Sequence, residues 1–572
     1  MSLNGVVAQA TSALLSTQTR IAVANANVAN ASETGYSRKL VSTEASTANT
    51  ALNQATVTRA ADAYLTRSLT KASGASAQAA VIDSYMQSYD AALGSTTQSD
   101  DLSSLVSAFQ ASLTALSASP DSDAAKTQVV SDAGSLAQAI KTLSGEIQTL
   151  RTEANVAIGD TVGQINDTLK TLQSLNDQIA SAGGADVTDL QDQRDTALTT
   201  LSGLIGISYY TDSQGRVAVY SAGGDQLLGA TAATLGYQVS SSLNADATYP
   251  DQIAALTLNG KDITGSVSGG TLGGLISLRD DSLVGEQAKL DALAAGLISQ
   301  TNAVAAGGTA YPPPNSLTGA TSVSGSDALW ATGSVRLAVV SSSGTLVSSQ
   351  DLDLSSYATV GDLVAGLDAI DGISAALSSD GKLVLSADDA SAGVAVASLD
   401  SAMGSPSQGF AAAFGLNAVF TGSSAADIGL SATLKSDPSK LPTAALGSGT
   451  LTVGDAVISV ADTTTTDALS AVFGQKTTFP SAGDFAAESG TLQGYATKFV
   501  SAAASLVSQA STSATSTQSV LDQVKTRLSD QTGVNMDEEL ANLTVYQNQY
   551  QATAQLVSIA KTLFESLISM VN

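Results

Sequence analysis

Both ends of the chain carry heptad spacings, and these constrain the fold more than any other feature. The N-terminal seam steps alternately by four and three residues, with Thr17 as its one polar member, through Leu3, Val7, Ala10, Leu14, Ile21, Ala24 and Val28. This spacing is typical of a helix that packs along another helix. Arg20 is the only charged residue among the first thirty. We therefore expect most sides of this helix to lie against protein.

A matching pattern occupies the far end. The C-terminal seam runs through Leu540, Leu543, Gln547, Tyr550, Ala554, Val557, Ala560, Phe564, Leu567 and Val571. Asp537, Glu538 and Glu539 precede it, where the helix dipole favours negative charge. The two terminal helices are expected to pair. Gln547 either sets the register of that pairing or is simply tolerated, and the pattern favours neither interpretation.

The segment between them is helical over 75–200, 272–303 and 491–529 by the same periodicity, with a break at Pro120 and a turn at Gly183-Gly184. We expect these stretches to form an elongated helical body.

Strand patterns interrupt the helices twice. Residues 207–220 alternate around the turn at 212–215, and Asn259-Gly260 is a strong hairpin signal. The segment 311–314, Tyr-Pro-Pro-Pro, is expected to be a stiff linker into a second β-rich region. In that region we predict alternation at Val335, Leu337 and Val339, a helix over 359–370, a hairpin across Asp380-Gly381, and another over 451–460. The aromatic side chains Trp330, Phe410, Phe414 and Phe420 are assigned to the core.

The predicted fold class is therefore α+β and multidomain, with an elongated helical body, paired coiled-coil-like terminal helices and inserted β-rich modules. The expected terminal unit comprises 1–60 and 530–572, and the rod-like helical domain 61–203, 270–306 and 482–529. The first β module is expected at 204–269 and the second at 307–481.

Composition excludes several classes of chemistry. The chain of 572 residues has no Cys and no His, which removes disulfides, thiol nucleophiles, Cys/His zinc sites and His-dependent triads. We expect no catalytic residue, cofactor site or metal site. The net charge of −27 argues against binding to nucleic acid or anionic membranes.

The N-terminus has no basic residue before Arg20, and no apolar run is long enough to cross a bilayer. We therefore expect no membrane insertion, and secretion, if it occurs, without a cleaved signal peptide.

Acidic pairs such as Asp280-Asp281 and Asp388-Asp389 could in principle serve a hydrolase as acid and base. Neighbouring residues on a strand point to opposite faces, and no third partner is apparent. Solvated surface is the better interpretation.

Two motifs at the ends carry a family resemblance. Residues 27–38, Asn-Val-Ala-Asn-Ala-Ser-Glu-Thr-Gly-Tyr-Ser-Arg, resemble the signature of bacterial flagellar rod, hook and hook-associated proteins, with Glu33-Thr34 where Thr-Pro is common. Residues 533–552, beginning Gly-Val-Asn-Met-Asp-Glu-Glu-Leu, resemble the hook-associated branch, whose members begin the hook–filament junction. The blocks at 192–195 and 273–280 are similar to internal segments of the same family. The resemblance is weak over 320–480.

The resemblance implies a structural subunit of the flagellum, exported by the flagellar type III system and assembled extracellularly through its terminal helices. Implied partners are further copies of the chain in a ring or helical lattice, the hook protein, hook-associated protein 3 and an export chaperone at the C-terminal helix. Besides the seam positions, the expected assembly interface includes Asn30, Gly35 and Tyr36. The alternatives are another axial subunit of hook or distal rod type, or a surface adhesin or enzyme carried on the β modules.

Overall fold

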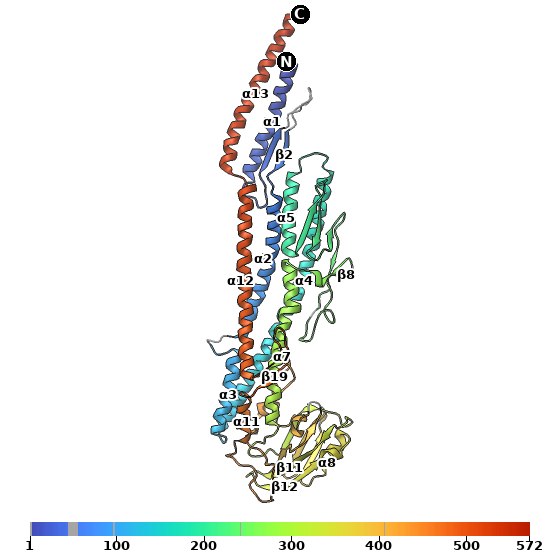
Figure 1. Cartoon of the computed structure of the whole chain (residues 1–572), viewed down its shortest axis with the longest axis vertical. Coiled ribbons are helices and arrows are strands. Elements are labelled where there is room, and N and C mark those ends of the chain that lie inside the picture. Colours follow the sequence, from blue (N-terminus) through green and yellow to red (C-terminus); the bar gives the residue numbers. More distant parts are fainter. Residues whose placement is uncertain (1–2, 44–54, 95–97, 241, 405–406, 572) are drawn as a thin grey trace.

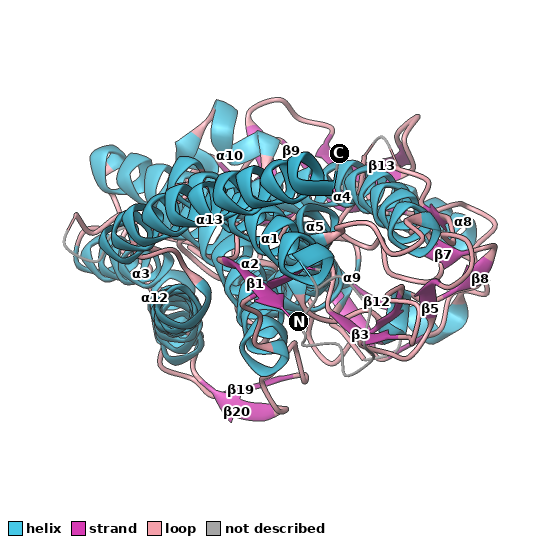
Figure 2. Ribbon diagram, turned by 90° about the horizontal axis from the view of Figure 1, so that it is seen from above, coloured by secondary structure: helices cyan, strands magenta, loops and turns pink. Residues whose placement is uncertain are grey.

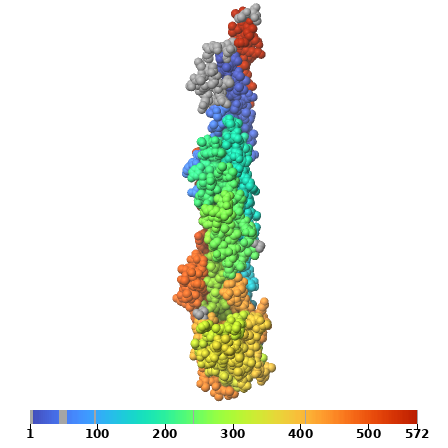
Figure 3. All heavy atoms as spheres, turned by 90° about the vertical axis from the view of Figure 1, so that its right-hand side faces the viewer, coloured from blue at the N-terminus to red at the C-terminus, as the bar shows by residue number. Residues whose placement is uncertain are grey.

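Helices account for most of the length of the molecule, which is shown as a computed structural model in Figure 1. The structure describes residues 3–43, 55–94, 98–240, 242–404 and 407–571, with the side chains of Leu3, Asn4, Thr43 and Val571 excepted. Both termini lie at one end, and a β-rich module lies at the other (Figures 1 and 3). The α+β class and the elongated form with paired terminal helices are confirmed.

The terminal unit consists of two long helices and a hairpin. Helix α1 (Leu3–Ala29) lies along α13 (Met536–Val571), and the hairpin of β1 (Lys39–Thr43) and β2 (Ala55–Arg59) packs beside α1. The sequence patterns did not predict this hairpin. In Figure 1, α13 extends beyond the N-terminal end of α1.

The rod below it is a helical bundle whose buried residues form two clusters, both of which include part of α4. Its helices are α2 (Ala63–Leu93), α3 (Leu102–Ala118), α4 (Asp123–Ser181), α5 (Thr188–Leu204), α6 (Gly270–Ser277), α7 (Leu283–Ala305) and α12 (Leu492–Thr532). Helix α4 has 59 residues, which corresponds to about 88 Å. Its buried stripe includes Leu136, Ile140, Leu143 and Ile147 at the predicted three- and four-residue steps. The break at Pro120 separates α3 from α4, as predicted.

Gly183 and Gly184 have φ of +58° and +95°, so they supply the left-handed backbone that turns the chain from α4 into α5. A π-helical turn, η2 (Leu278–Ser282), joins α6 to α7. Asp280-Asp281 therefore lies on this turn, and its assignment to a strand is wrong.

The first β module lies against α4. It contains a sheet of β3 (Ile207–Thr211), β4 (Val217–Ser221) and β5 (Gln226–Leu228), and a smaller one of β6 (Leu235–Gly236), β7 (Thr257–Leu258) and β8 (Lys261–Asp262). The two predicted hairpins, β3–β4 and β7–β8, are confirmed. Asn259 and Gly260 both have positive φ, as a tight two-residue turn requires.

The second β module forms the far end of the molecule. Its sheets have the orders β12-β11-β15 and β13-β14-β9, and α8 (Val360–Asp368) packs on β13. The strands are β9 (Ser316–Ser322), β11 (Ser334–Ser341), β12 (Leu346–Asp353), β13 (Ile373–Leu377), β14 (Lys382–Ala387) and β15 (Ala392–Ala397). A short pair, β10 (Ala331–Thr332) with β16 (Ala402–Met403), and helix α9 (Phe410–Ala413) complete it.

The predicted hairpin across Asp380-Gly381 is confirmed with the expected register, Ala375 opposite Leu385. The predicted helix over 359–370 is also confirmed, as α8 (Val360–Asp368). Thr359 and Asp362 form a reciprocal capping box at its start. Strand β11 alternates less than expected, because cores on both of its faces bury Val335 through Val340.

Three other expectations about this region are wrong. Residues 451–460 form turns with a single bridge, Thr345 to Ala456, instead of a hairpin, because the segment covers the sheet of β11 and β12. Trp330 is 80% exposed and is not a core residue, whereas Phe410, Phe414 and Phe420 are buried. The segment 311–314 is no free linker, since Pro314 O accepts a hydrogen bond from Val394 N and Tyr311 packs in the module.

The chain then returns to the rod through β17 (Phe420–Thr421), β18 (Gly429–Leu430), α10 (Ala432–Ser436), η4 (Pro438–Lys440), α11 (Thr464–Val472), β19 (Thr477–Phe479) and β20 (Glu488–Gly490). Phe420 and Phe473 make edge-to-face contacts with Phe109 of α3, at 5.8 and 5.4 Å between ring centroids. Much of 419–481 therefore packs in the core of the rod and outside the second β module. Seen down the long axis, β19 and β20 lie at the edge of the helical body (Figure 2).

Candidate assembly interface

The pairing of α1 with α13 uses one face of each helix. On α13, Glu539 and Asn542 are buried or half-buried at its start, and from Leu543 onward the covered positions follow alternating steps of three and four: Leu543, Tyr546, Tyr550, Thr553, Val557 and Ala560. On α1, Ala24 is buried and Val7, Ala10, Leu14, Ile21 and Val28 are half-buried. The guanidinium of Arg20 lies over the ring of Tyr546, 5.8 Å from its centroid.

The structure separates the predicted positions of α13 into two groups. Leu543, Tyr550 and Val557 face the pairing, whereas Leu540, Gln547, Ala554, Phe564 and Leu567 are exposed. Leu3 and Val571 belong to α1 and α13, but their side chains lie outside the described residues. The contacting face includes Tyr546 and Thr553. The predicted seam had their neighbours Gln547 and Ala554 in their place, one residue out of phase.

A polar cluster holds the terminal helices to the rod. We call it the end-motif cluster, and it comprises Asn27, Gly35, Tyr36, Ser37, Arg38, Lys39, Arg59, Asp189, Asp192, Asp195, Glu538 and Glu539. It joins the end of α1, the hairpin, the first turns of α5 and the start of α13. Residues far apart in the sequence thus meet in one place.

Asn27 fixes the turn that follows α1. Its side chain is buried, donates a hydrogen bond from Nδ2 to Lys39 O (3.0 Å) and accepts one at Oδ1 from Lys39 N (2.9 Å). The Tyr36 hydroxyl donates to the same Oδ1 at 3.0 Å. Asn27 therefore binds the backbone of the first strand as a neighbouring strand would. Asn30, also in the predicted set, follows the end of α1 and donates from Nδ2 to Ala26 O of that helix at 3.0 Å.

Gly35 allows this turn to approach α5. Its φ is +86°, and a β-carbon there would collide with Oγ1 of Thr196. The next residue but one, Ser37, donates hydrogen bonds from its backbone N (3.2 Å) and its hydroxyl to the carboxylate of Asp192. Gly35 itself is exposed, so its importance lies in the backbone.

Arg38 connects the N-terminal motif to the C-terminal one. Its guanidinium donates to Glu539 Oε1 and Glu538 Oε1, each at 2.7 Å, and its backbone N donates to Thr532 O at 2.8 Å. The Glu539 side chain is only 5% exposed. Burial lowers the pKa of the Arg38 guanidinium, but the hydrogen bonds and charges of Glu538 and Glu539 outweigh burial and raise it.

Arg59 and Lys39 connect the hairpin to α5. Arg59 pairs with Asp192 at 2.9 Å and with Asp195 at 2.5 Å, and Lys39 pairs with Asp189. Burial lowers the pKa of Arg59, and the charge of Asp195 and the bonds to both carboxylates more than reverse this. Burial also raises the pKa of Tyr36 to about 12, with the charges of Asp189 and Asp192 adding to the effect.

The sequence motifs contain many residues of this cluster, but the contacts that these residues make could not be predicted from the motifs. Glu538 and Glu539 were explained by the helix dipole alone, and Arg59 and Asp189 were not singled out. Charge scarcity was the available signal, because only Lys561 and Glu565 are charged from Leu540 onward while three acidic residues stand together at 537–539. In a segment so poor in charge, such a group indicates a partner.

The block at 273–280 anchors the first β module. Arg279 is buried and binds Asp280 through two hydrogen bonds of 2.7 Å, and it also donates to the hydroxyl of Tyr237. Arg151 of α4, fully buried, donates to Arg279 O and to backbone carbonyls at Asn244 and Ala247. Asp280 is thus an ion-pair partner and not solvated surface.

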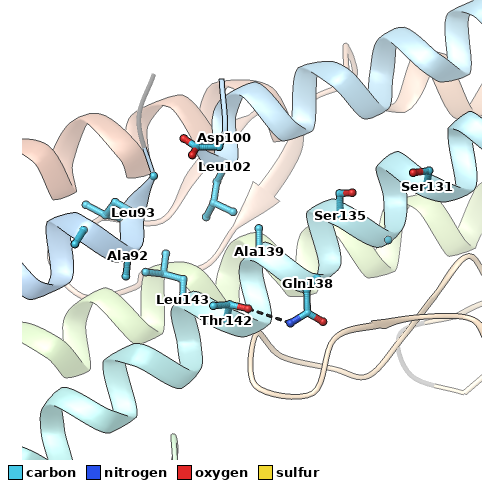
Figure 4. Close-up of a pocket in the computed structure, with 13 residues that line it drawn as sticks. Ala92, Leu93, Asp100, Leu102, Ser131, Ser135, Gln138, Ala139, Thr142 and Leu143 are labelled. Atoms are coloured by element: carbon cyan, nitrogen blue, oxygen red, sulfur yellow. Dashed lines mark hydrogen bonds between the residues drawn. The ribbon is translucent and has the colours of Figure 1, made fainter. Parts of the chain in front are cut away.

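A groove of about 670 Å³ lies where α2 and α3 pass over α4 (Figure 4). Leu93, Leu102 and Leu143 form its apolar part, and small side chains of α4 such as Ser131 and Ser135 line the rest. Asp100 is the one ionisable side chain among its described lining residues.

None of the described helices is both long and apolar enough to cross a bilayer.

The distal part of α13 carries an unpaired apolar surface. Every described side chain from Lys561 to Met570 is exposed. The exposed apolar residues of α13 from Val545 onward are Val545, Leu556, Ile559, Leu563, Phe564, Leu567, Ile568 and Met570. An apolar surface of this extent, on a helix with two charges in the same stretch, is typical of an interface.

Comparisons with known proteins agree with this architecture. A family model described as the flagellar hook-associated protein FlgK helical domain matches residues 86–316, and one described as the flagellar basal body rod FlgEFG protein C-terminal matches 530–570. Both family models describe flagellar proteins; one covers much of the rod and the first β module, and the other covers α13.

The chain is 26% identical over 589 residues to flagellar hook-associated protein 1 of Salmonella typhimurium, and 25% identical over 597 residues to that of Escherichia coli K12. Each alignment covers 99% of this chain and 100% of the relative. The fold is similar to that of the flagellar hook junction protein FlgK from Burkholderia pseudomallei, with a TM-score of 0.50, 19% identity, and coverage of 80% of this chain and 98% of that one. Over its whole length the chain is therefore similar to flagellar hook-associated protein 1, and the family model of that protein's helical domain matches its middle part.

Proposed function

We propose that this chain is a structural subunit of the hook–filament junction, incorporated through its terminal helices. The observation that carries the proposal is the exposed apolar surface of α13, which continues past the part of the helix that α1 covers. Burial of such a surface stabilises association by about 25 cal/mol per Å². A mechanical role needs this kind of contact and no reactive group.

The predicted interface residues divide accordingly into two roles. The positions that face the pairing, such as Leu543 and Tyr550, hold α1 to α13 within one subunit. The exposed positions, such as Phe564 and Leu567, contact neighbouring subunits. Gly35 and Tyr36 act indirectly, because they shape the turn that sets the terminal pair on the rod.

The proposed partners are other copies of the chain in a ring or helical lattice, the hook protein on one side and hook-associated protein 3 on the other. An export chaperone covers the apolar C-terminal helix before assembly, and the flagellar type III system exports the subunit. The names of the relatives support the junction site, and the exposed helix supports the need for a cover.

We propose the following division of the chain. Residues 1–60 and 530–572 form the terminal assembly unit, and 61–203, 270–306 and 482–529 form the rod. The modules at 204–269 and 307–418 project from it, and we assign most of 419–481 to the rod because its aromatic residues pack on α3.

The rival within the same class is a hook or distal rod subunit. The helical-domain match at 86–316 favours the hook-associated family. An adhesin would keep its function without α13, whereas a junction subunit would lose it. The experiment below distinguishes these functions.

A strain lacking the gene should be complemented with the full chain, with a chain lacking 541–572, and with Leu567→Asp. The control is Ser519→Asp, at an exposed position of α12. We expect the truncation and Leu567→Asp to give hooks without filaments and filament protein in the medium, by electron microscopy and immunoblotting. The full chain and the control should restore swimming. Normal filaments with the truncated chain would contradict the proposal.

A further inference from the structure

A cavity of about 310 Å³ lies between the second β module and the segment that returns to the rod. Strands β9 and β14 supply one wall, with Thr318 and Lys382, and α10 and η4 supply the other, with Thr433 and Lys440. Leu317 and Leu434 also line it, and both belong to the hydrophobic cores on either side of the cavity. The cavity is large enough for a molecule the size of a monosaccharide, near the lower limit of ligand sites.

The charge of this cavity is opposite to that of its surroundings. Residues 307–481 contain five Lys and Arg and fifteen Asp, with no Glu. Two of those five cations line the cavity, and no carboxylate does. Each lysine has a neighbouring carboxylate that does not line the cavity: Asp380 lies 3.1 Å from Lys382, and the charge of Lys440 acts on Asp437 without a direct ion pair within the described residues. A positive site in a chain of net charge −27 concentrates anions.

Hydroxyl groups complete the lining. The side chains of Thr318, Ser431 and Thr433 line the cavity and make no hydrogen bond to other described groups of the protein. Each hydroxyl can both donate and accept. The cavity thus offers two cationic donors, several hydroxyl groups and apolar surface within one small volume.

We propose that this cavity binds a small anion that carries hydroxyl groups, of the size and chemistry of a sugar acid. The carboxylate lies between Lys382 and Lys440, the ligand hydroxyls contact Thr318, Ser431 and Thr433, and the apolar face of the ligand packs on Leu317 and Leu434. The site joins a projecting module to the rod, so an occupied site also ties these two parts together.

The test uses the full chain at low ionic strength, with glucuronate as the probe and glucose and inorganic phosphate as comparison ligands. Binding is followed by calorimetric titration and by saturation-transfer NMR. Lys382→Ala and Lys440→Ala each remove one cavity cation. Lys435→Ala is the matched control, because Lys435 is an exposed lysine of the same short helix region that does not line the cavity.

We expect the unmodified chain to bind glucuronate at least fivefold more tightly than glucose or phosphate. Each cavity variant should weaken glucuronate binding at least fivefold, and Lys435→Ala should change it less than twofold. Absence of glucuronate binding, equal binding of phosphate, or equal weakening by the control would each overturn the proposal. Circular dichroism of the variants shows that any loss is not due to unfolding.

Discussion

Arg38 is bound by two carboxylates that come from the opposite end of the chain, and one of them, Glu539, is nearly buried. Removal of an arginine from such a group costs more than the attraction itself, because the remaining carboxylate stays desolvated. The N-terminal motif therefore contributes to the position of α13 through a single side chain.

Arg38→Ala should destabilise the docking of α13 by about 2–3 kcal/mol, since Arg38 is partly exposed and the loss falls below that of a fully buried pair. Hydrogen exchange by mass spectrometry should show faster exchange at the start of α13 and unchanged exchange in α4. The control is Lys561→Ala, whose exposed partner Glu565 lies 3.9 Å away, and which should cost roughly 0.5 kcal/mol or less. Equal effects of the two variants would show that the Arg38 pairs contribute little.

Ionisation of Tyr36 should reduce the stability of the end-motif cluster at high pH. Burial raises its pKa to about 12 in the folded chain, above the usual value of 10. A raised folded pKa stabilises the folded state below pH 10, and this stabilisation is lost as the pH rises from 10 towards 12, because the unfolded chain releases the proton first.

The stability difference between the unmodified chain and Tyr36→Phe should therefore shrink above pH 10. Below that pH, the unmodified chain should be more stable by about 1 kcal/mol through the hydrogen bond to Asn27. Thermal unfolding followed by circular dichroism from pH 8 to 11 measures this. Tyr64→Phe, at an exposed side chain, is the control. A difference that stays constant with pH would refute the role assigned to Tyr36.

Among individual residues, those that belong to a recognisable sequence motif could be predicted. Gly35 and Tyr36 stood in a recognisable motif, and both lie in the end-motif cluster. Arg59 and Asp189 could not be predicted, because ion pairs between elements depend on how the hairpin and α5 meet in space. Trp330 was misassigned because hydrophobic character does not determine burial.

At the scale of elements, helix α13 presents two apolar faces that serve different contacts. A heptad reading of its sequence selected members of both, since positions three and four residues apart remain close on the helix surface. The pairing with α1 selects the face of Leu543, Tyr550 and Val557 and leaves the face of Leu540 exposed. The phase of a seam thus depends on its partner as well as on its own spacing.

Leu543→Asp should disrupt the pairing of α1 and α13, because it places an unpaired charge in a buried position and removes a leucine side chain. The cost is at least about 3 kcal/mol. The matched control is Leu540→Asp, at an exposed residue of the same helix turn, where about 0.5 kcal/mol is expected. Hydrogen exchange in α1 reports on the pairing. Equal protection of α1 in the two variants would show that this face does not hold the helices together.

At the scale of the whole molecule, the order of helices and strands was predictable because periodicities of 3.6 and 2 residues distinguish them over long stretches. The extent of the second β module was not, because the return segment 419–481 contains strand and turn patterns like those of the module itself. What assigns most of it to the rod is packing, as Phe420 and Phe473 against Phe109 show. The β1–β2 hairpin was also missed, because its strands are only five residues long and give a weak pattern.

The contacts of Arg38 can form only late in the synthesis of the chain. They join residues 500 and 501 positions apart in the sequence. Bringing residues so far apart in the chain together costs conformational entropy. The contact can offset this cost only when both partners are present. During synthesis Arg38 has no Glu538 or Glu539 to bind until almost the entire polypeptide has been made. A chain that stops before Glu538 lacks both carboxylates, so this contact forms only after nearly all of the polypeptide is present.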